Sequence, residues 1–203
     1  MESYYHILFD KLSEDQLERK KLGDLFTIKG GATPSTKYPE YFCQEGGIPW
    51  VGIKDLTSRK GKFIDRGETN ITQEGYNSCS TYIIPEDSIL FSCRGTIGVI
   101  AINDQQICFT RGLFGLFGDK FLKNYFWFLL KDNLEKIKGL GRGTVMSGMG
   151  QEDLRNFQIN LPPRLLMVTF EQICEPFFQI QKTNEKEIRE LLKLQKYFIE
   201  LTN

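Results

Sequence analysis

The feature that most constrains this sequence is a heptad repeat in its C-terminal segment, residues 164–203. Mostly apolar residues recur there in steps that alternate strictly between four and three residues. This spacing is typical of a helix that pairs with another helix through two positions in every seven. We call these positions the heptad stripe: Leu166, Phe170, Ile173, Phe177, Ile180, Asn184, Glu187, Leu191, Leu194, Phe198 and Leu201. We therefore expect a long coiled-coil helix over 164–203.

The stripe predicts dimerisation and also contains its own irregularities. The dimerisation residues that we expect are Phe177, Ile180, Asn184, Leu191, Leu194, Phe198 and Leu201. Asn184 falls at an a position, where a buried amide lowers stability but fixes register and partner number. Pro176 interrupts the helical hydrogen bonds, so we expect a bend near Gln172 or a short leading helix before a longer one. The alternative is a helix that packs back on its own domain.

Charge and cysteine content exclude several classes of protein. Of the 203 residues, 26 are Lys or Arg and 26 are Asp or Glu, so no net charge attracts nucleic acid or a membrane over distance. DNA recognition by a local basic patch remains possible. The five cysteines have no CxxC spacing, which argues against a disulfide framework or a metal site. Neither a signal peptide nor a membrane-spanning run is recognisable. We expect a cytoplasmic protein without a membrane partner.

The rest of the sequence indicates an α+β fold with three parts: an N-terminal arm with a short helix at 1–21, a globular domain of short strands and helices at 22–163, and the helix at 164–203. Ser13 and Gln16 form a capping-box pair that predicts a helix ending at Gly23. Thr72 and Asp119 are expected to cap two further helices, the second covering 120–138. Strands are expected at 48–53, 60–64, 80–85, 88–93, 98–102, 106–110 and 157–161.

Motifs for catalysis are missing from the sequence. His6 is the single histidine, which removes Ser-His-Asp and Cys-His arrangements and almost any imidazole metal site. The phosphate-binding pattern GxxxxGK[ST] is absent, and "GLGRGTV" follows a predicted helix instead of the strand that a dinucleotide-binding loop requires. The prediction is therefore a protein without catalytic activity, cofactor or metal.

Basic and hydroxyl-bearing loops are the candidates for binding. Arg and Lys bridge guanine O6 and N7 or hold phosphates, and Ser and Thr reach either group. The alternative is that these charges only solvate the loops. The candidate DNA-binding residues are Lys54, Arg59, Lys60, Lys62, Arg94, Thr96, Arg111, Arg142, Thr144 and Ser147.

The order of short segments from about residue 22 to 203 resembles a known family. The segments are "LGDLFTIKGGATPS", "GIPWVGIKDL", "ITQEGYNSCS", "IIPEDSILFSCRGTIGVIAI", "GRGTVMSGMGQEDLRNFQINLPP" and "FEQICEPF". Together they resemble the target-recognition domain and one spacer helix of the specificity (S) subunit of type I restriction–modification systems. One departure is Arg111-Gly112, where that family often has Asn-Gln.

The resemblance implies a non-catalytic subunit that reads double-stranded DNA. In that family the S subunit recognises a bipartite site and docks two adenine-N6 methyltransferase (M) subunits, and restriction (R) subunits join to make the nuclease. The usual chain has two recognition domains and two antiparallel helices. This chain has one of each, so we expect a half-subunit that pairs with itself or with another S chain. Two alternatives stay open: a truncated fragment or exchange cassette, and a protein- or RNA-interaction module on the same scaffold.

Overall fold

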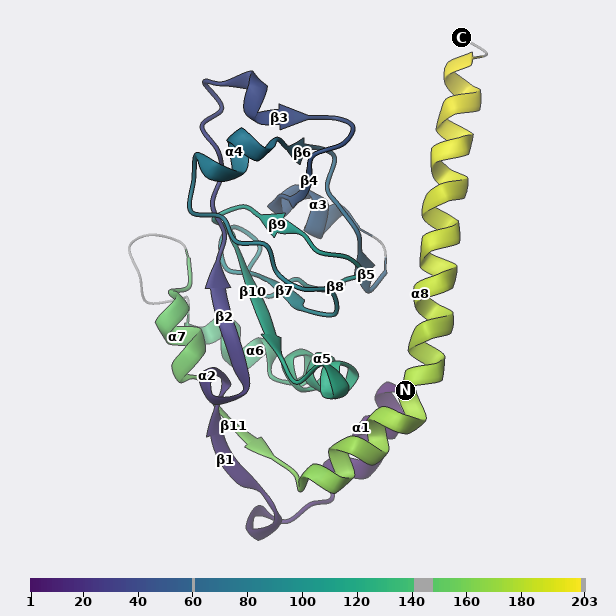
Figure 1. Cartoon of the computed structure of the whole chain (residues 1–203). Helices are drawn as coiled ribbons and strands as arrows, with labels where there is room; N and C mark the ends of the chain where they lie inside the picture. The colour runs from purple at the N-terminus through teal and green to yellow at the C-terminus, as the bar shows by residue number, and fades with distance from the viewer. Residues whose placement is uncertain (60, 141–147, 202–203) are drawn as a thin grey trace.

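A computed structural model describes residues 1–59, 61–140 and 148–201 and shows the predicted α+β architecture (Figure 1). At its centre is a sheet with the strand order β2-β10-β7-β8-β5. Neighbouring strands in it are antiparallel, except that β5 runs parallel to β8. The strands are β2 (Phe26–Gly30), β5 (Phe63–Ile64), β7 (Ile89–Ser92), β8 (Ile100–Asn103) and β10 (Leu113–Gly118).

Two smaller sheets lie at opposite ends of the central sheet (Figure 1). One has the strand order β3-β6-β4-β9, and the other is the antiparallel pair β1-β11. Their strands are β3 (Phe42–Cys43), β4 (Ile48–Val51), β6 (Asn70–Ile71), β9 (Cys108–Phe109), β1 (Glu18–Lys21) and β11 (Gln158–Leu161).

The central sheet separates two hydrophobic cores. Side chains alternate along a strand, so Phe91 of β7 faces one core and Leu90 faces the other. The first core lies under α1 (Glu2–Phe9), α5 (Lys123–Asp132), α6 (Leu134–Leu140) and the start of α8 (Arg164–Leu201). Its aromatic centre includes Tyr5, whose ring centroid lies 5.4 Å from that of Phe128 and 5.7 Å from that of Phe170. The N-terminal segment is therefore part of the folded core.

The prediction of a helix that ends at Gly23 is wrong. The pair Ser13–Gln16 does form, with the Ser13 N–H donating to Gln16 Oε1 at 3.1 Å, but it starts only the 3₁₀ turn η1 (Glu14–Gln16). The next residues form β1, because they pair with β11, and α2 (Leu22–Leu25) follows. Tertiary pairing has overridden the local helix signal.

The other helix predictions are partly confirmed. Asp119 accepts from the Phe121 N–H at 3.0 Å, and the Thr72 hydroxyl accepts from the Gly75 N–H at 3.1 Å, so both predicted caps form. The helix predicted over 120–138 is divided at Asn133. Its pieces are η3 (Lys120–Leu122), α5 and α6. Further short helices are η2 (Pro39–Tyr41), α3 (Ile53–Ser58), α4 (Gln73–Asn77) and α7 (Gln151–Asn156).

Most of the predicted strands are confirmed within a few residues. The exception is segment 80–85, where only Ile84 forms an isolated bridge, to Ile107. The strands β2, β3, β6 and β10 were not predicted. The most important of them is β10, which pairs with both β2 and β7 and so lies inside the central sheet.

The C-terminal helix α8 has 38 residues, which corresponds to about 57 Å at 1.5 Å per residue. It contains Pro176 and is continuous across it. Figure 1 shows a lower segment that passes beneath the domain, then a bend, then a long upper segment beside it. A bent single helix thus replaces the alternative of two helices. None of the helices in the described part of the chain is long and apolar enough to cross a membrane.

Candidate functional site

Exposed basic side chains come together where β7 ends and β10 begins, at the end of two inner strands of the central sheet. These strands are antiparallel, and their pairing continues because the Cys93 N–H donates to the Gly112 carbonyl oxygen at 2.9 Å. Arg94, just after β7, and Arg111, just before β10, therefore extend from neighbouring strand ends on the same side of the sheet. Both side chains are exposed, as is Thr96 in the following turn. We call Arg94, Thr96 and Arg111 the basic edge.

Backbone geometry fixes the turn that carries this edge. Gly95 and Gly98 have φ angles of 65° and 88°, a left-handed conformation that glycine adopts without a steric penalty. The Ser92 hydroxyl donates to the carbonyl oxygen of Thr96 at 2.5 Å and accepts from the Val99 N–H at 2.8 Å. The turn is thus held from inside, and its exposed side chains are left for contacts with a ligand.

Two segments that are distant in sequence contact the same turn. Gly148 forms an isolated antiparallel bridge with Arg94. A Cβ atom added at Gly98 would lie 2.8 Å from Cε of Lys138 in α6. The predicted loop residues between these two segments lie outside the described residues; they are Arg142, Thr144 and Ser147. The segments that precede and follow them both contact the turn at 94–98 that carries part of the basic edge.

The helix α3 lies beside this edge. A Cβ atom at Gly112 would lie 2.2 Å from Cδ1 of Ile53, so the α3 side chain packs directly on the Gly112 backbone. A larger residue at this position would require the Ile53 side chain to shift. Lys54 follows in α3 and is exposed, with its Nζ 3.3 Å from a carboxylate oxygen of Glu68. An exposed pair of this kind contributes little stability and leaves Lys54 accessible.

Arg59 is directed toward its own domain. Its guanidinium donates to the carbonyl oxygens of Gly61, of Phe63 at 3.4 Å and of Ile100 at 3.0 Å. Burial lowers the pKa of Arg59 to about 10. The Arg59 guanidinium was predicted to contact DNA, but in the structure it bonds with backbone oxygens of its own domain. Lys60 lies outside the described residues.

The sequence interpretation placed Lys62 among the DNA-binding residues. In the structure Lys62 lies in the core. It is 4% exposed, and Nζ lies 3.1 Å from the ring centroid of Phe178 and 4.7 Å from that of Trp127. Within the described part of the chain Nζ has no hydrogen-bond partner. Burial lowers the pKa of Lys62 well below its ordinary value, although the carboxylates of Glu171 and Glu185 oppose this. Lys62 therefore contacts α8 from inside.

The heptad stripe of α8 is mostly exposed. Side-chain exposure is 56% at Phe177, 58% at Ile180 and 53% at Leu194. Asn184, Leu191 and Phe198 are exposed as well. The start of the stripe differs, because Phe170 is fully buried in the first core and Leu166 is half-buried. The side chain of Leu201 lies outside the described residues.

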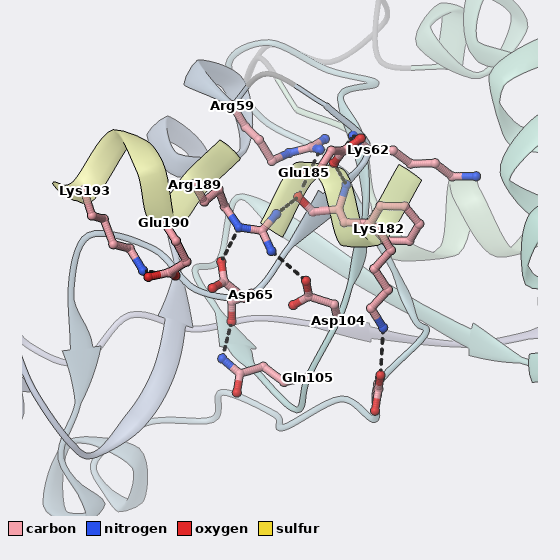
Figure 2. Close-up of polar contacts among 12 residues, drawn as sticks. Arg59, Lys62, Asp65, Asp104, Gln105, Lys182, Glu185, Arg189, Glu190 and Lys193 are labelled. Carbon is pink, nitrogen blue, oxygen red and sulfur yellow. Dashed lines mark hydrogen bonds and ion pairs between the residues drawn. The ribbon is translucent and has the colours of Figure 1, made fainter. Parts of the chain in front are cut away.

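The opposite face of α8 contacts the domain through charged residues that the sequence interpretation missed. Glu171, Glu185 and Arg189 all bond with groups of the globular part (Figure 2 shows Glu185 and Arg189). They lie at b and f positions of the same heptads, where charges are usual in any coiled coil. The available signal was their spacing of fourteen residues (two heptads) and four residues. It did not reveal which groups they contact.

The basic edge is suited to binding a ligand. In the described residues no group of three or more His, Cys, Asp or Glu is placed to hold a metal ion. His6 lies in α1 with Nδ1 3.1 Å from a carboxylate oxygen of Asp10. The basic edge, by contrast, offers two guanidinium groups and a hydroxyl on a fixed turn. Such groups bond with base edges and phosphates.

Comparison with known proteins identifies the family to which this chain is similar. Residues 14–194 match the family model described as the type I restriction modification DNA specificity domain. The chain is 33% identical over 146 residues to the Type I restriction enzyme MjaIX specificity subunit of Methanocaldococcus jannaschii, covering 70% of this chain and 33% of the relative. It is 35% identical over 95 residues to the EcoR124I/EcoR124II specificity subunit of Escherichia coli, covering 47% and 22%.

Solved structures share the fold. The S subunit of a type I restriction–modification system from M. genitalium superposes with a TM-score of 0.65 at 16% identity, covering 96% of this chain and 50% of that chain. The HsdS subunit of Thermoanaerobacter tengcongensis gives a TM-score of 0.57 at 17% identity, covering 94% and 47%. The chain thus spans about half of these two structures and a third or less of the two curated relatives named above.

Proposed function

Since the chain belongs to the type I restriction–modification DNA specificity family, we propose that it is a non-catalytic half-subunit that reads one half of a bipartite DNA site. The observation that carries the proposal is the combination of one basic edge and one helix with an exposed heptad stripe. The edge suits base and phosphate contacts, and the helix suits a second specificity chain.

The basic edge and its surroundings support duplex DNA as the ligand. Arg94, Thr96 and Arg111 are exposed at the ends of paired strands, and the exposed Lys54 follows Ile53, which lies against Gly112. Because the chain has no net charge, affinity has to come from such a local concentration of donors. We leave Arg59 and Lys62 out of the proposed DNA surface, and we retain Lys60, Arg142, Thr144 and Ser147 as sequence-based candidates.

The span of the chain supports pairing. It covers about half of the solved S-subunit structures that it resembles. A second copy of this chain, or another S chain, would supply the other half of the reader. Two-fold pairing of identical domains would place them on inverted half-sites, so the target would be an interrupted palindrome.

Assembly with partner subunits is part of the same proposal. The assembled pair would dock adenine-N6 methyltransferase subunits and then restriction subunits, which supply the catalysis. It would act on DNA in the cytoplasm. The alternatives are a truncated specificity fragment, an exchange cassette, and a protein- or RNA-binding module, and none of them would select a duplex sequence in the following experiment.

The test is selection of DNA from a random duplex library by the full chain with its methyltransferase subunits, followed by titration at several salt concentrations. We expect one short sequence in two inverted copies. A reader of this kind binds more weakly as salt rises, because phosphate contacts release counterions. A binder of RNA or protein would enrich no duplex sequence.

Arg94→Ala and, separately, Arg111→Ala test the basic edge. Loss of a bidentate base contact should weaken binding to the selected site by about 1–3 kcal/mol and relax one base position. Loss of a phosphate contact should weaken all sequences alike and flatten the salt slope. The matched control is Arg19→Ala, which removes an exposed arginine from β1, beyond the other end of the central sheet (Figure 1). Wild-type binding by both edge variants would refute this surface.

A further inference from the structure

The face of α8 that points away from the heptad stripe contacts the domain at every seventh residue. Glu171, Phe178 and Glu185 occupy equivalent b positions, and all three contact the globular part. Arg189, one turn after Glu185, adds a fourth contact. We call these four residues of α8 the joint.

The first contact of the joint is a helix cap supplied from another helix. The buried carboxylate of Glu171 accepts from the backbone N–H groups of Asn124 at 3.1 Å and Tyr125 at 3.0 Å, and from Asn124 Nδ2 at 2.6 Å. These two N–H groups lie in the first turn of α5, where no intrahelical acceptor exists and the helix dipole favours a negative charge. Glu171 thus ties α8 to the N-terminus of α5.

The third contact repeats this chemistry on a loop. The carboxylate of Glu185 accepts from the N–H of Lys62 at 2.9 Å and from the N–H of Phe63 at 2.8 Å (Figure 2). Gly61 precedes them with a φ angle of 118°, and a Cβ atom there would lie 2.5 Å from Glu185 Oε2. Only glycine leaves room for the carboxylate, so the loop matches an anion from α8.

Ion pairs extend the joint along the edge of the sheet. Arg189 lies between two carboxylates, with Nη2 2.8 Å from Asp104 and Nε 3.5 Å from Asp65 (Figure 2). Its partner Asp104 has only 7% of its side chain exposed, so the pair is screened little by solvent. Lys182 of α8 lies 2.9 Å from Glu86. These contacts hold the helix against the last strands of the sheet.

Phe178 fills the space between the two carboxylate contacts. It is buried and lies against the Lys62 amine, as described above. Pro176, the cause of the bend, lies in the sequence between Glu171 and Glu185. The helix is therefore fastened on both sides of the bend, and its direction after the bend is fixed relative to the domain.

We propose that the joint sets the angle between the recognition domain and α8 and thereby selects the spacing between DNA half-sites. The inference rests on the proposed function, which supplies the half-sites. Hydrogen bonds to paired backbone N–H groups are directional, whereas apolar contacts tolerate sliding and rotation. A helix fastened in this way keeps a single orientation while its heptad stripe is left for a partner. Helix length alone would not define the spacing.

The direct test is hydrogen exchange at the N–H groups of Lys62 and Phe63 in the full-length chain. Glu185→Ala should speed their exchange about 10- to 100-fold, because the bonds to a charged acceptor are lost. Gly61→Ala should act in the same direction, by forcing the carboxylate away. Arg189→Ala is a milder variant that leaves Glu185 in place. The matched control is Lys186→Ala on the same turn of α8, where the side chain is exposed.

The functional test measures binding of these variants to duplexes in which the half-site spacing is varied by one base pair at a time. The joint variants should bind several spacings with affinities within about threefold of one another, whereas wild type and Lys186→Ala should prefer one. A purely structural loss of stability would weaken every spacing alike.

The outcomes separate the two proposals. A wild-type chain that prefers no spaced, inverted site overturns the proposed function and the spacing role together. A sharp wild-type preference that persists in Glu185→Ala and Arg189→Ala overturns the joint alone. Unchanged exchange at Lys62 and Phe63 in Glu185→Ala also overturns it.

Discussion

The two faces of α8 use different physics. The heptad stripe has exposed apolar residues such as Phe177 and Leu194. The opposite face has Glu171 and Glu185, whose carboxylates accept from paired backbone N–H groups of the domain. Apolar contact is strong and non-directional, which suits association with a partner. Charge-assisted hydrogen bonds are directional, which suits a fixed angle. The difference teaches that one helix can be fastened to its own domain and remain available to another chain.

The largest expected effect concerns the stripe. Leu194→Glu should abolish self-association, because Leu truncation in a packed interface costs about 2–5 kcal/mol and a buried charge adds to that cost. At 1.4 kcal/mol per tenfold, the truncation alone is a loss of about 30-fold or more in affinity, and the buried charge increases it. Sedimentation velocity over a concentration series measures it.

The chain provides a closely matched control in Leu192→Glu. Leu192 is 58% exposed and Leu194 is 53% exposed, but Leu192 lies at a b position off the stripe. It should associate like wild type. A monomeric wild type, or equal effects of the two variants, would mean that the exposed face is not a partner surface.

Sequence periodicity was sufficient to predict this exposed face. The four–three spacing identified Phe177, Ile180 and Leu194, and these residues are indeed left uncovered by their own domain. The spacing was insufficient at Phe170, which has the same heptad position as Phe177 but is buried in the core. Periodicity reports which side chains share a face. It does not report where along the helix the domain ends.

The opposite face was beyond sequence analysis because its partners are distant in the chain. Glu185 accepts from the N–H of Lys62, which is 123 positions earlier. No local pattern distinguishes that contact from a solvated glutamate. Lys62 itself was assigned to a DNA surface because it lies in a basic segment, and only the position of α8 shows that it is covered. The prediction of β1 as a helix failed for the same reason, since β11 is its distant partner.

The second prediction addresses the fastened face. Glu171→Ala should lower the free energy of unfolding by on the order of 3 kcal/mol, because the N–H groups of Asn124 and Tyr125 lose their acceptor in a buried site. Gln172→Ala, at the exposed neighbouring position, should change it little. Urea denaturation of both variants measures the difference. Equal stability would show that the carboxylate only offsets its own desolvation.

The third prediction uses the unpaired amine inside the joint. Lys62→Met keeps the length of the side chain and removes a buried amine without a hydrogen bond, so it should raise the free energy of unfolding by about 1–3 kcal/mol at neutral pH. Lys54→Met, at an exposed lysine, is the control and should have little effect.

The pH dependence of that gain follows from the lowered pKa of Lys62. Between the lowered native pKa and the ordinary value of 10.5, the unfolded chain binds a proton at Lys62 that the folded chain does not. The free-energy cost of burying the Lys62 amine is therefore fully present below the native pKa, and it declines as pH rises toward 10.5. The advantage of Lys62→Met over wild type should shrink over that range. A difference that stays constant or grows with pH would indicate a paired, charged amine.

The smallest expected effect returns to the stripe at Asn184. Its neighbours on the stripe are the apolar Ile180 and the charged Glu187, and the next a positions on either side are the apolar Phe177 and Leu191. In an antiparallel pair two copies can meet near the two-fold axis and hydrogen-bond. Asn184→Leu should then strengthen association by about 1 kcal/mol, because an amide is no longer desolvated. It should also loosen register and partner number. Sedimentation equilibrium, with trimers or mixed species expected beside dimers, measures both. Thr183→Leu, one position off the stripe, should leave a single species, so mixed species in both variants would indicate non-specific association.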